Sequence, residues 1–344
     1  MRILAILTVR NEGAFLIEWL AHHRLCGVTD ILVFSNDCDD GTDAMLDRLQ
    51  AMGWLIHARN PGPHPQGPQW AALKAADRHP LAGMADWTIV LDIDEFVNVQ
   101  VGDRTLPALL AALPEATAVA LVWRMFGNAG VAQIADSPVT EQFIRAAPRV
   151  LHWPWRAQQI KTLFRRDGSF ARFGVHRPRA PDPARLAHQV WLDGSGRRLP
   201  PAFHTGPSFA PPGQDHYALA QINHYAVGSM QGYLVKCDRG RANREGGTFD
   251  MSYWIERNFC DVEETSILPL TAAATPLRAD MMADPVLGPL HRAAVEWRRA
   301  RFAALMAAGE GWRALYGRLL MTAPTRCLTE SEAREVWRHG RAGP

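Results

Sequence analysis

Two aspartates stand one residue apart after a short apolar run, in Leu91-Asp92-Ile93-Asp94-Glu95-Phe96. Alternate side chains of an extended segment share one face, so Asp92 and Asp94 can point together at one cation. Carboxylate oxygens are the ligands that Mg²⁺ and Mn²⁺ prefer. The pair therefore predicts a divalent-metal site, whose charge would offset that of a diphosphate. The alternative, for an isolated D-x-D, is a solvated turn at the end of a strand.

Two further polar clusters each follow an apolar run. They are Arg10-Asn11-Glu12, after residues 3–9, and Asn36-Asp37-Cys38-Asp39-Asp40-Gly41, after residues 31–35. Short acids and amides accept hydrogen bonds from base edges and sugar hydroxyls. A helix cap with an Asx turn is an alternative or additional role for Asp40-Gly41-Thr42. If all three clusters follow parallel strands, they meet in one crevice.

The elements that must position these clusters alternate between strand and helix. The apolar run 3–9 precedes helical spacing over 13–25, which Gly27 stops, and Thr42 is expected to cap a second helix. We expect further strands at residues 54–57, 87–91, 119–123 and 159–164, and further helices at 69–79, 229–237, 290–306 and 311–320. This order predicts an α/β fold with a doubly wound, mostly parallel sheet. The final stretch from Thr322 is expected to be partly loose.

Composition narrows the class of protein. With 344 residues, 47% of them hydrophobic and 21% charged, the chain has the composition of a globular protein with one main unit. A net charge of +2 gives no global attraction to nucleic acid. Five cysteines without C-x-x-C spacing favour a reducing, cytoplasmic compartment. The apolar run 3–9 is too short for a signal peptide, and we expect no membrane-spanning segment.

The three clusters, in this order and approximate spacing, carry a family resemblance. Thr8-Val9-Arg10-Asn11-Glu12, the Asn36 to Thr42 loop and the D-x-D segment resemble family 2 glycosyltransferases and are similar also to family 92. The resemblance implies a GT-A (Rossmann-like) fold with added C-terminal helices. It also implies hexosyl transfer, with inversion, from a nucleoside-diphosphate sugar to the hydroxyl of a glycan or lipid-linked acceptor. Mn²⁺ or Mg²⁺ would be the cofactor, and polysaccharide or glycoconjugate synthesis the setting.

The resemblance also assigns residues. For the nucleotide-sugar pocket it indicates Thr8, Arg10, Asn11, Glu12, Asn36, Asp37, Asp40 and Asp92. The metal would be bound by Asp92, Asp94 and, from the segment Asn223-His224-Tyr225, by His224. Contacts to phosphate are expected from Lys161, Lys236 and Arg239. His176 is a candidate for metal binding, acceptor positioning or general base. A buried structural role or a solvated basic face is the alternative for each of these cations and histidines.

The same resemblance predicts how the chain is divided. Residues 1–245 would form the GT-A domain, with 1–100 holding the nucleotide and 101–245 the acceptor, and residues 246–344 would form a helical extension. The catalytic base is not identified, since five acids between the D-x-D and His224 are open: Asp136, Glu141, Asp182, Asp193 and Asp215.

Two other functions remain as alternatives. One is a non-catalytic protein that binds nucleotide-sugars or glycans, with Trp153, Trp155 and Trp191 stacking on sugars. The other is an aspartyl-phosphate phosphatase, which the position of the acidic pair late in the strand series and Phe96 after it disfavour. Arginines in the C-terminal helices, among them Arg298 and Arg301, would bring the chain to the inner face of an anionic membrane or form a solvated face.

Overall fold

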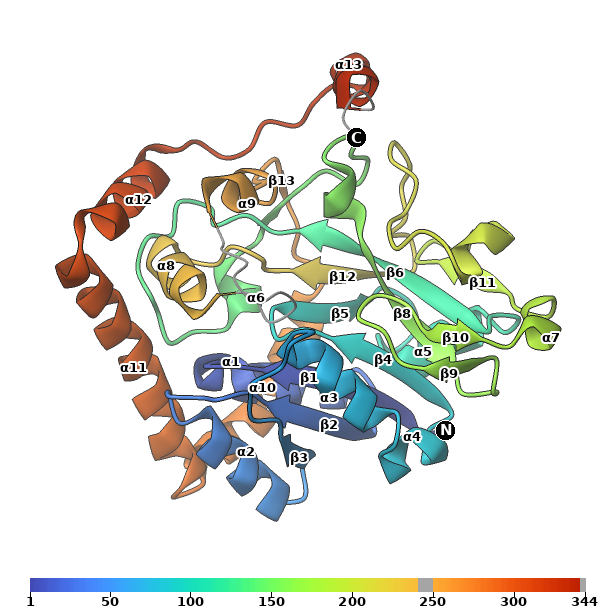
Figure 1. Ribbon diagram of the computed structural model, residues 1–344, viewed down its shortest axis with the longest axis horizontal. Helices are drawn as coiled ribbons and strands as arrows, with labels where there is room; N and C mark the ends of the chain where they lie inside the picture. Colours follow the sequence, from blue (N-terminus) through green and yellow to red (C-terminus); the bar gives the residue numbers. More distant parts are fainter. Residues whose placement is uncertain (241–249, 341–344) are drawn as a thin grey trace.

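A large central sheet organises the structure, a computed structural model that describes residues 1–240 and 250–340 (Figure 1). Its strand order is β3-β2-β1-β4-β8-β6-β12-β5, and β11 also pairs with β6. The strands are β1 (Ile3–Val9), β2 (Asp30–Ser35), β3 (Ile56–Arg59), β4 (Trp87–Leu91), β5 (Glu95–Val99), β6 (Ala118–Met125), β8 (Ile160–Arg165), β11 (Trp191–Asp193) and β12 (Ala220–His224). Two small antiparallel sheets join β9 (Phe170–Arg172) to β10 (Arg179–Pro181), and β7 (Arg145–Ala146) to β13 (Val262–Glu263).

The strand directions confirm the expected mostly parallel sheet and add two reversals. β1 runs parallel to β2 and β4, and β2 runs parallel to β3. β8 is antiparallel to both of its neighbours, β4 and β6, and β5 is antiparallel to β12. The sheet is therefore mixed, with its parallel half built by the first ninety residues.

Helices cover both faces of the sheet. The longer ones are α1 (Gly13–Leu25), α2 (Thr42–Ala51), α3 (Pro68–Ala76), α8 (Met230–Arg239), α10 (Leu268–Ala283), α11 (Leu287–Ala308), α12 (Glu310–Met321) and α13 (Glu330–Gly340). Shorter ones are α4 (Pro80–Met84), α5 (Leu106–Ala112), α6 (Val139–Gln142), α7 (Pro183–Leu186), α9 (Met251–Ile255) and the 3₁₀ turns η1 (Trp155–Gln158) and η2 (Pro201–His204). No helix in the described ranges is both long enough and apolar enough to cross a bilayer.

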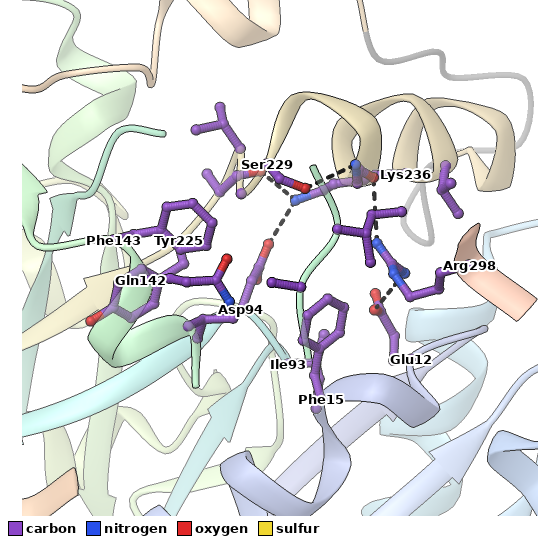
Figure 2. A pocket seen from close by; sticks show the side chains of 18 of the residues that line it. Glu12, Phe15, Ile93, Asp94, Gln142, Phe143, Tyr225, Ser229, Lys236 and Arg298 are labelled. Atoms are coloured by element: carbon purple, nitrogen blue, oxygen red, sulfur yellow. Dashed lines mark hydrogen bonds and ion pairs between the residues drawn. The ribbon is translucent and has the colours of Figure 1, made fainter. Parts of the chain in front are cut away.

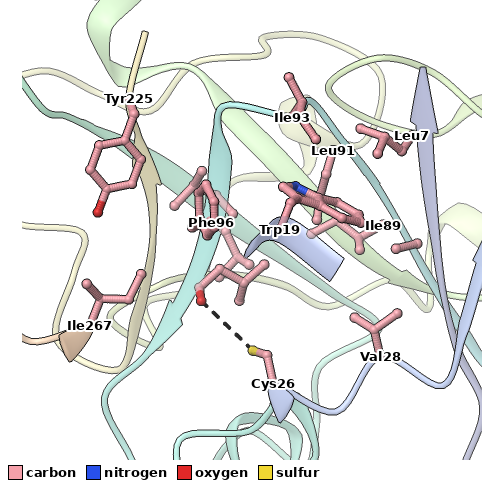
Figure 3. Close-up of a cluster of buried hydrophobic side chains, with 14 of the residues drawn as sticks. Leu7, Trp19, Cys26, Val28, Ile89, Leu91, Ile93, Phe96, Tyr225 and Ile267 are labelled. Carbon is pink, nitrogen blue, oxygen red and sulfur yellow. Dashed lines mark hydrogen bonds between the residues drawn. The ribbon is translucent and has the colours of Figure 1, made fainter. Parts of the chain in front are cut away.

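Alternate side chains of β1 pack into two separate hydrophobic cores. Ala5 and Leu7 pack into a core that includes residues of α1 and α2, whereas Leu4 and Ile6 join a core with residues of α3 and α4. This division explains why β1 is an unbroken apolar run, since both of its faces are covered. In the first core, Figure 3 shows Trp19 of α1 and Phe96 of β5 among the aliphatic side chains of β4.

The expected C-terminal helices are present and pack on the α/β half. α10 and α11 contact α1, and α11 also contacts α2 and α8 (Figure 1). The predicted domain boundary, between residues 245 and 246, lies outside the described residues, so that division stays a prediction. The expectation of a partly loose end from Thr322 fits residues 322–329, which form no helix or strand, but not α13, an amphipathic helix that places Trp337 against Trp153.

Asp40, rather than Thr42, organises the start of two helices. One Asp40 oxygen accepts the N–H of Gly13 at the start of α1 (3.0 Å), and the other accepts the N–H of Thr42 at the start of α2 (2.9 Å). The N-cap of α2 is Gly41, whose φ of 87° suits a residue without Cβ, so the expected Thr42 cap is wrong. Helix starts carry unsatisfied N–H groups, and this carboxylate satisfies one in each helix.

We therefore expect Asp40→Ala to lower the free energy of unfolding by about 1–2 kcal/mol, as the loss of a helix cap does. Urea titration followed by circular dichroism measures the change. Asp39→Ala, at the exposed neighbouring position, is the matched control and should change stability by less than about 0.5 kcal/mol. Equal effects of the two substitutions would contradict the capping role.

Candidate active site

A cleft of about 560 Å³ opens where β1, β2 and β4 end. Ten of the residues predicted to bind the nucleotide-sugar or the metal, or to act as the base, line it: Thr8, Arg10, Glu12, Asn36, Asp92, Asp94, His176, His224, Lys236 and Arg239. All three polar clusters thus contribute to one cleft, although they are separated by up to eighty residues. The opposite wall is formed by Trp123, by η1 and by α9. The position of these residues is established, and the role of each stays a prediction.

The D-x-D segment is a tight turn between β4 and β5. The N–H of Glu95 donates to the carbonyl of Asp92 (3.1 Å), and the Glu95 carboxylate accepts the N–H of Asp92 in return (2.9 Å). The indole N–H of Trp19 lies 3.2 Å from the carbonyl oxygen of Asp92 and 3.1 Å from that of Glu95. These bonds fix the backbone from which both aspartates project.

Asp92 is neutralised by a lysine that lies beneath the turn. The Lys161 ammonium is fully buried, 2.9 Å from Asp92 Oδ2 and 3.2 Å from Glu95 Oε2. Gln69 donates to Asp92 Oδ1 (2.9 Å) and the Trp123 indole donates to Glu95 Oε1 (2.8 Å). Burial opposes ionisation of Asp92, but the charge of Lys161 keeps its pKa below the usual value. Burial raises the pKa of Glu95 to about 8.

Lys161 therefore supports the turn instead of lining the cleft. Its two carboxylate partners use its charge, and its direct contact with a phosphate stays a prediction.

Asp94 faces the ammonium group of Lys236 (Figure 2) and the imidazole ring of His224. Lys236 of α8 donates to Asp94 Oδ2 and to the carbonyl of Ala226, both at 2.7 Å, and His224 Nε2 lies 3.6 Å from Asp94 Oδ1. Burial alone would raise the pKa of Asp94, but Lys236 and then His224 hold it well below the usual range. Asp94 is therefore an anion at the point where a strand end, β12 and α8 meet.

The predicted three-ligand metal shell is not assembled. No group of three His, Cys, Asp or Glu residues lies at metal-binding spacing in the described part of the chain. Asp92 has both oxygens occupied by Lys161 and Gln69, whereas Asp94 and His224 lie close enough to share one ion. Mg²⁺ commonly binds one or two protein carboxylates and completes its shell with substrate phosphates. The pair Asp94 and His224 therefore fits a divalent cation that arrives with a diphosphate.

His176 presents an unprotonated ring nitrogen. Its Nδ1 lies 3.1 Å from the carbonyl oxygen of Ile160, and because a carbonyl only accepts, Nδ1 carries the proton and Nε2 the lone pair. Burial and then the charge of Lys161 lower the pKa of His176 to about 3, so the ring is neutral. The ring packs edge-on against Trp123, with centroids 5.6 Å apart.

The five acids left open as the base lie elsewhere in the described structure. Asp193 is buried with His216, Asp215 pairs with Arg149, and Asp136 pairs with His291. Asp182 caps α7, and Glu141 lies exposed in α6. None of the five lines the cleft as the described residues define it.

Three residues that were predicted to bind the nucleotide instead bind backbone N–H groups of neighbouring segments. Asn11, with a φ of 54°, accepts the N–H of Asp39 (2.7 Å), and Asp37 accepts the N–H of Gly62 (3.1 Å). The third is Asp40, whose carboxylate binds the two helix starts. None of the three lines the cleft among the described residues. The helix-cap alternative weighed for Asp40 is the role that its contacts support.

The sequence did not reveal several residues of the cleft. Gln69, at the start of α3, binds Asp92, and Arg156 comes from η1, next to Trp155, which was considered above for stacking on sugars. α9 contributes a group close to Lys236, whose Nζ lies 5.5 Å from the ring centre of Tyr253. Pro68 before Gln69 is a helix-start signal that was available. For α9, a five-residue helix, the signal was its N-cap Asp250, which accepts the N–H of Tyr253 (3.1 Å).

Glu12 is occupied by two arginines. It forms an ion pair with Arg239 of α8, and its Oε2 lies 3.9 Å from Nη1 of Arg298 on α11. Arg239 also donates to the carbonyl of Arg10 (3.2 Å). Glu12 thus anchors Arg239 at the cleft, and a role in binding base or ribose stays a prediction.

Comparisons with known proteins agree with this geometry. The model of glycosyltransferase family 92 matches residues 7–184. A family 92 protein of Ricinus communis is 28% identical over 94 residues, covering 27% of this chain and 16% of that protein. One of Oryza sativa subsp. japonica is 27% identical over 139 residues, covering 38% and 22%. The chain thus matches less than a quarter of the length of either relative.

Solved structures with a partial likeness include S. aureus TarS and the glucosyl-3-phosphoglycerate synthase of Mycobacterium tuberculosis crystallised with Mn²⁺ and uridine diphosphate. Each is 17% identical with a TM-score of 0.29; TarS covers 37% of this chain and 22% of its own, and the synthase 49% and 59%. The mixed sheet with helices on both faces confirms the GT-A expectation. Because the family model spans more than half of its residues, the chain belongs to glycosyltransferase family 92.

Proposed function

We propose that this glycosyltransferase moves a hexosyl group, with inversion, from a nucleoside-diphosphate sugar to an acceptor hydroxyl, assisted by Mn²⁺ or Mg²⁺. The observation that carries the proposal is the arrangement around Asp94. An anionic carboxylate, a histidine nitrogen 3.6 Å from it and the Lys236 ammonium meet in a cleft that residues at the ends of β1 and β2 also line. Such a site suits a diphosphate held by a cation and by lysine.

The cleft residues divide by position. Thr8, Arg10 and Asn36, at the ends of β1 and β2, would bind the nucleoside, and Asp92 the ribose. A bound cation would lie against Asp94 and His224 and offset the charge of the departing diphosphate. Lys236 and Arg239 would stabilise the same charge from α8. Glycosyl transfer passes through a state with oxocarbenium character, so control of the leaving-group charge is the main task of the protein.

His176 is our proposed base. Its Nε2 lone pair belongs to a residue that lines the cleft, while Nδ1 is fixed to Ile160. A pKa of about 3 makes the imidazole a weak base by itself, and a diphosphate in the cleft would raise that pKa by its negative charge. The ring would then accept the proton of the acceptor hydroxyl as that oxygen attacks the anomeric carbon.

The geometry disfavours the phosphatase alternative but not the non-catalytic binding protein. A phosphatase needs a free aspartate nucleophile, but Lys161 and Gln69 occupy both oxygens of Asp92, and the chain belongs to a glycosyltransferase family. A protein that binds a nucleotide-sugar without turnover would use the same cleft. Donor turnover therefore separates binding from transfer.

The setting is also a proposal. We propose a glycan or lipid-linked acceptor in polysaccharide or glycoconjugate synthesis, in the cytoplasm or at the inner face of the membrane. The five cysteines are free, which supports a reducing compartment. Of the arginines considered for membrane contact, Arg298 is buried and so is not part of a solvated basic face, whereas Arg301 is exposed and pairs with Asp238.

A screen of UDP, GDP, ADP and CDP with and without MnCl₂ tests the proposal. One nucleotide should raise the thermal midpoint in the presence of Mn²⁺, since a ligand at about a hundred times its Kd stabilises a protein by about 2.7 kcal/mol. The matching nucleotide-sugar should then be turned over, and EDTA should stop turnover until Mn²⁺ is restored. Binding without turnover would support the non-catalytic alternative, and turnover in EDTA would reject the metal assignment.

A further inference from the structure

One arginine of the C-terminal helices lies beside residues of the candidate active site. Arg298 of α11 is 6% exposed, although it lies in a helix whose other arginines face solvent or surface partners. Its guanidinium carbon lies 4.7 Å from the ring centre of Phe15 at the start of α1, and Nη2 donates to the carbonyl of Gly232 in α8 (3.4 Å). With its ion pair to Glu12, Arg298 contacts the end of β1, α1 and α8 (Figure 2).

The charges around Glu12 are unequal. The single carboxylate of Glu12 faces the guanidinium groups of Arg239 and Arg298. Burial lowers the pKa of both arginines, in each case to about 10, so both remain charged at neutral pH. Asp40 also acts on Arg298, and Arg10 acts on Arg239, so two carboxylates face three guanidinium groups and a surplus positive charge remains.

The two arginines differ in where they can act. Arg239 lines both the open cleft and a smaller, mostly apolar hollow between α1, α6 and α8, whereas Arg298 lines the hollow and not the cleft. The surplus charge is therefore available to an anion in the cleft through Arg239. When Arg239 turns toward such an anion, Arg298 keeps a counterion beside Glu12, and no buried carboxylate is left unpaired.

We infer that Arg298 is a positioning residue for the donor diphosphate, acting through Glu12 and Arg239. It holds the end of β1 against α8, one turn before Lys236, and so sets the direction in which α8 presents its cations. The inference rests on the proposed function, because it takes a nucleoside diphosphate as the anion. It makes α11, which lies outside the family-matched residues 7–184, a working part of the donor site.

The test compares Arg298→Met with Arg298→Lys and with Arg299→Met. Arg299 is the neighbouring residue, exposed and paired with Glu296 on the same helix, so its substitution is the matched control. Calorimetry measures the Kd for whichever of UDP, GDP, ADP and CDP the wild-type protein binds with MnCl₂. Arg298→Met should weaken binding roughly tenfold, which corresponds to about 1.4 kcal/mol. Arg298→Lys, which keeps the charge, should recover part of the affinity, and Arg299→Met should stay within twofold.

A double substitution distinguishes positioning from general stabilisation. Because Arg298 acts through Arg239, Arg298→Met should weaken binding little further in an Arg239→Met background. Additive losses would overturn the inference, and so would wild-type affinity in a folded Arg298→Met protein. If Arg298→Met fails to fold, the same comparison with Arg298→Lys decides. If the wild-type protein binds no nucleoside diphosphate, the proposed function fails instead.

Discussion

Asp94→Asn is expected to lower kcat for sugar transfer by about 10²–10³-fold, the loss typical of removing one group that stabilises developing charge. The amide keeps the size of the side chain but removes the negative charge that Lys236 and His224 face at 2.7 and 3.6 Å. A cation would lose its protein carboxylate, and Lys236 would lose the partner that aims it into the cleft. Steady-state kinetics over a Mn²⁺ series measures the effect.

The fold should survive this substitution, because the Asp94 side chain is 24% exposed and the turn is held by backbone bonds to Trp19 and Glu95. Circular dichroism and the thermal midpoint check this point. Asp280→Asn, at an exposed position of α10, serves as the control and should leave kcat unchanged. Full activity of folded Asp94→Asn protein would reject the assignment of Asp94 as metal ligand.

Lys161→Met is expected to cost about 3–5 kcal/mol of unfolding free energy, as removing one partner of a buried ion pair does. The substitution leaves Asp92 without its 2.9 Å partner and Glu95, which is fully buried, without its 3.2 Å partner. Urea titration at neutral pH measures the loss. Lys74→Met, on the exposed face of α3, is the control and should have little effect.

A second substitution isolates the cause. Asp92→Asn removes the charge that Lys161 balances but retains an acceptor for the Gln69 amide, so Lys161→Met combined with Asp92→Asn should be more stable than Lys161→Met alone. If the double variant is less stable than the single one, the loss comes from packing around the lysine stem and not from an uncompensated charge.

Local sequence signals were sufficient for the elements whose boundaries were predicted correctly. β1, α1 and β4 have the expected bounds, because their patterns and stop signals lie within the segments themselves. β5 was not predicted, since it begins at Glu95, inside the motif that was interpreted as a turn. β12 and α10 were also missed. The antiparallel insertion of β8 between β4 and β6 depends on pairing over long distances, which no local pattern reports.

In the candidate site, too, local signals were predictive and long-range contacts were not. Asp92 and Asp94 lie in the cleft because a strand end fixes where they point. Asn11 and Asp37 do not, because their side chains bind backbone groups of neighbouring loops. Arg298 reaches Glu12 from 286 residues further along the chain, through helix packing, so its contribution was visible only in three dimensions.

Helix α1 connects two parts of the cleft. It begins next to Glu12, which holds Arg239, and carries Trp19, whose indole clamps the backbone of the D-x-D turn. The separation between Glu12 and the D-x-D turn is therefore set by less than two helical turns, which do not stretch. If the cleft binds a nucleotide-sugar as proposed, this side of it keeps the same length for every donor.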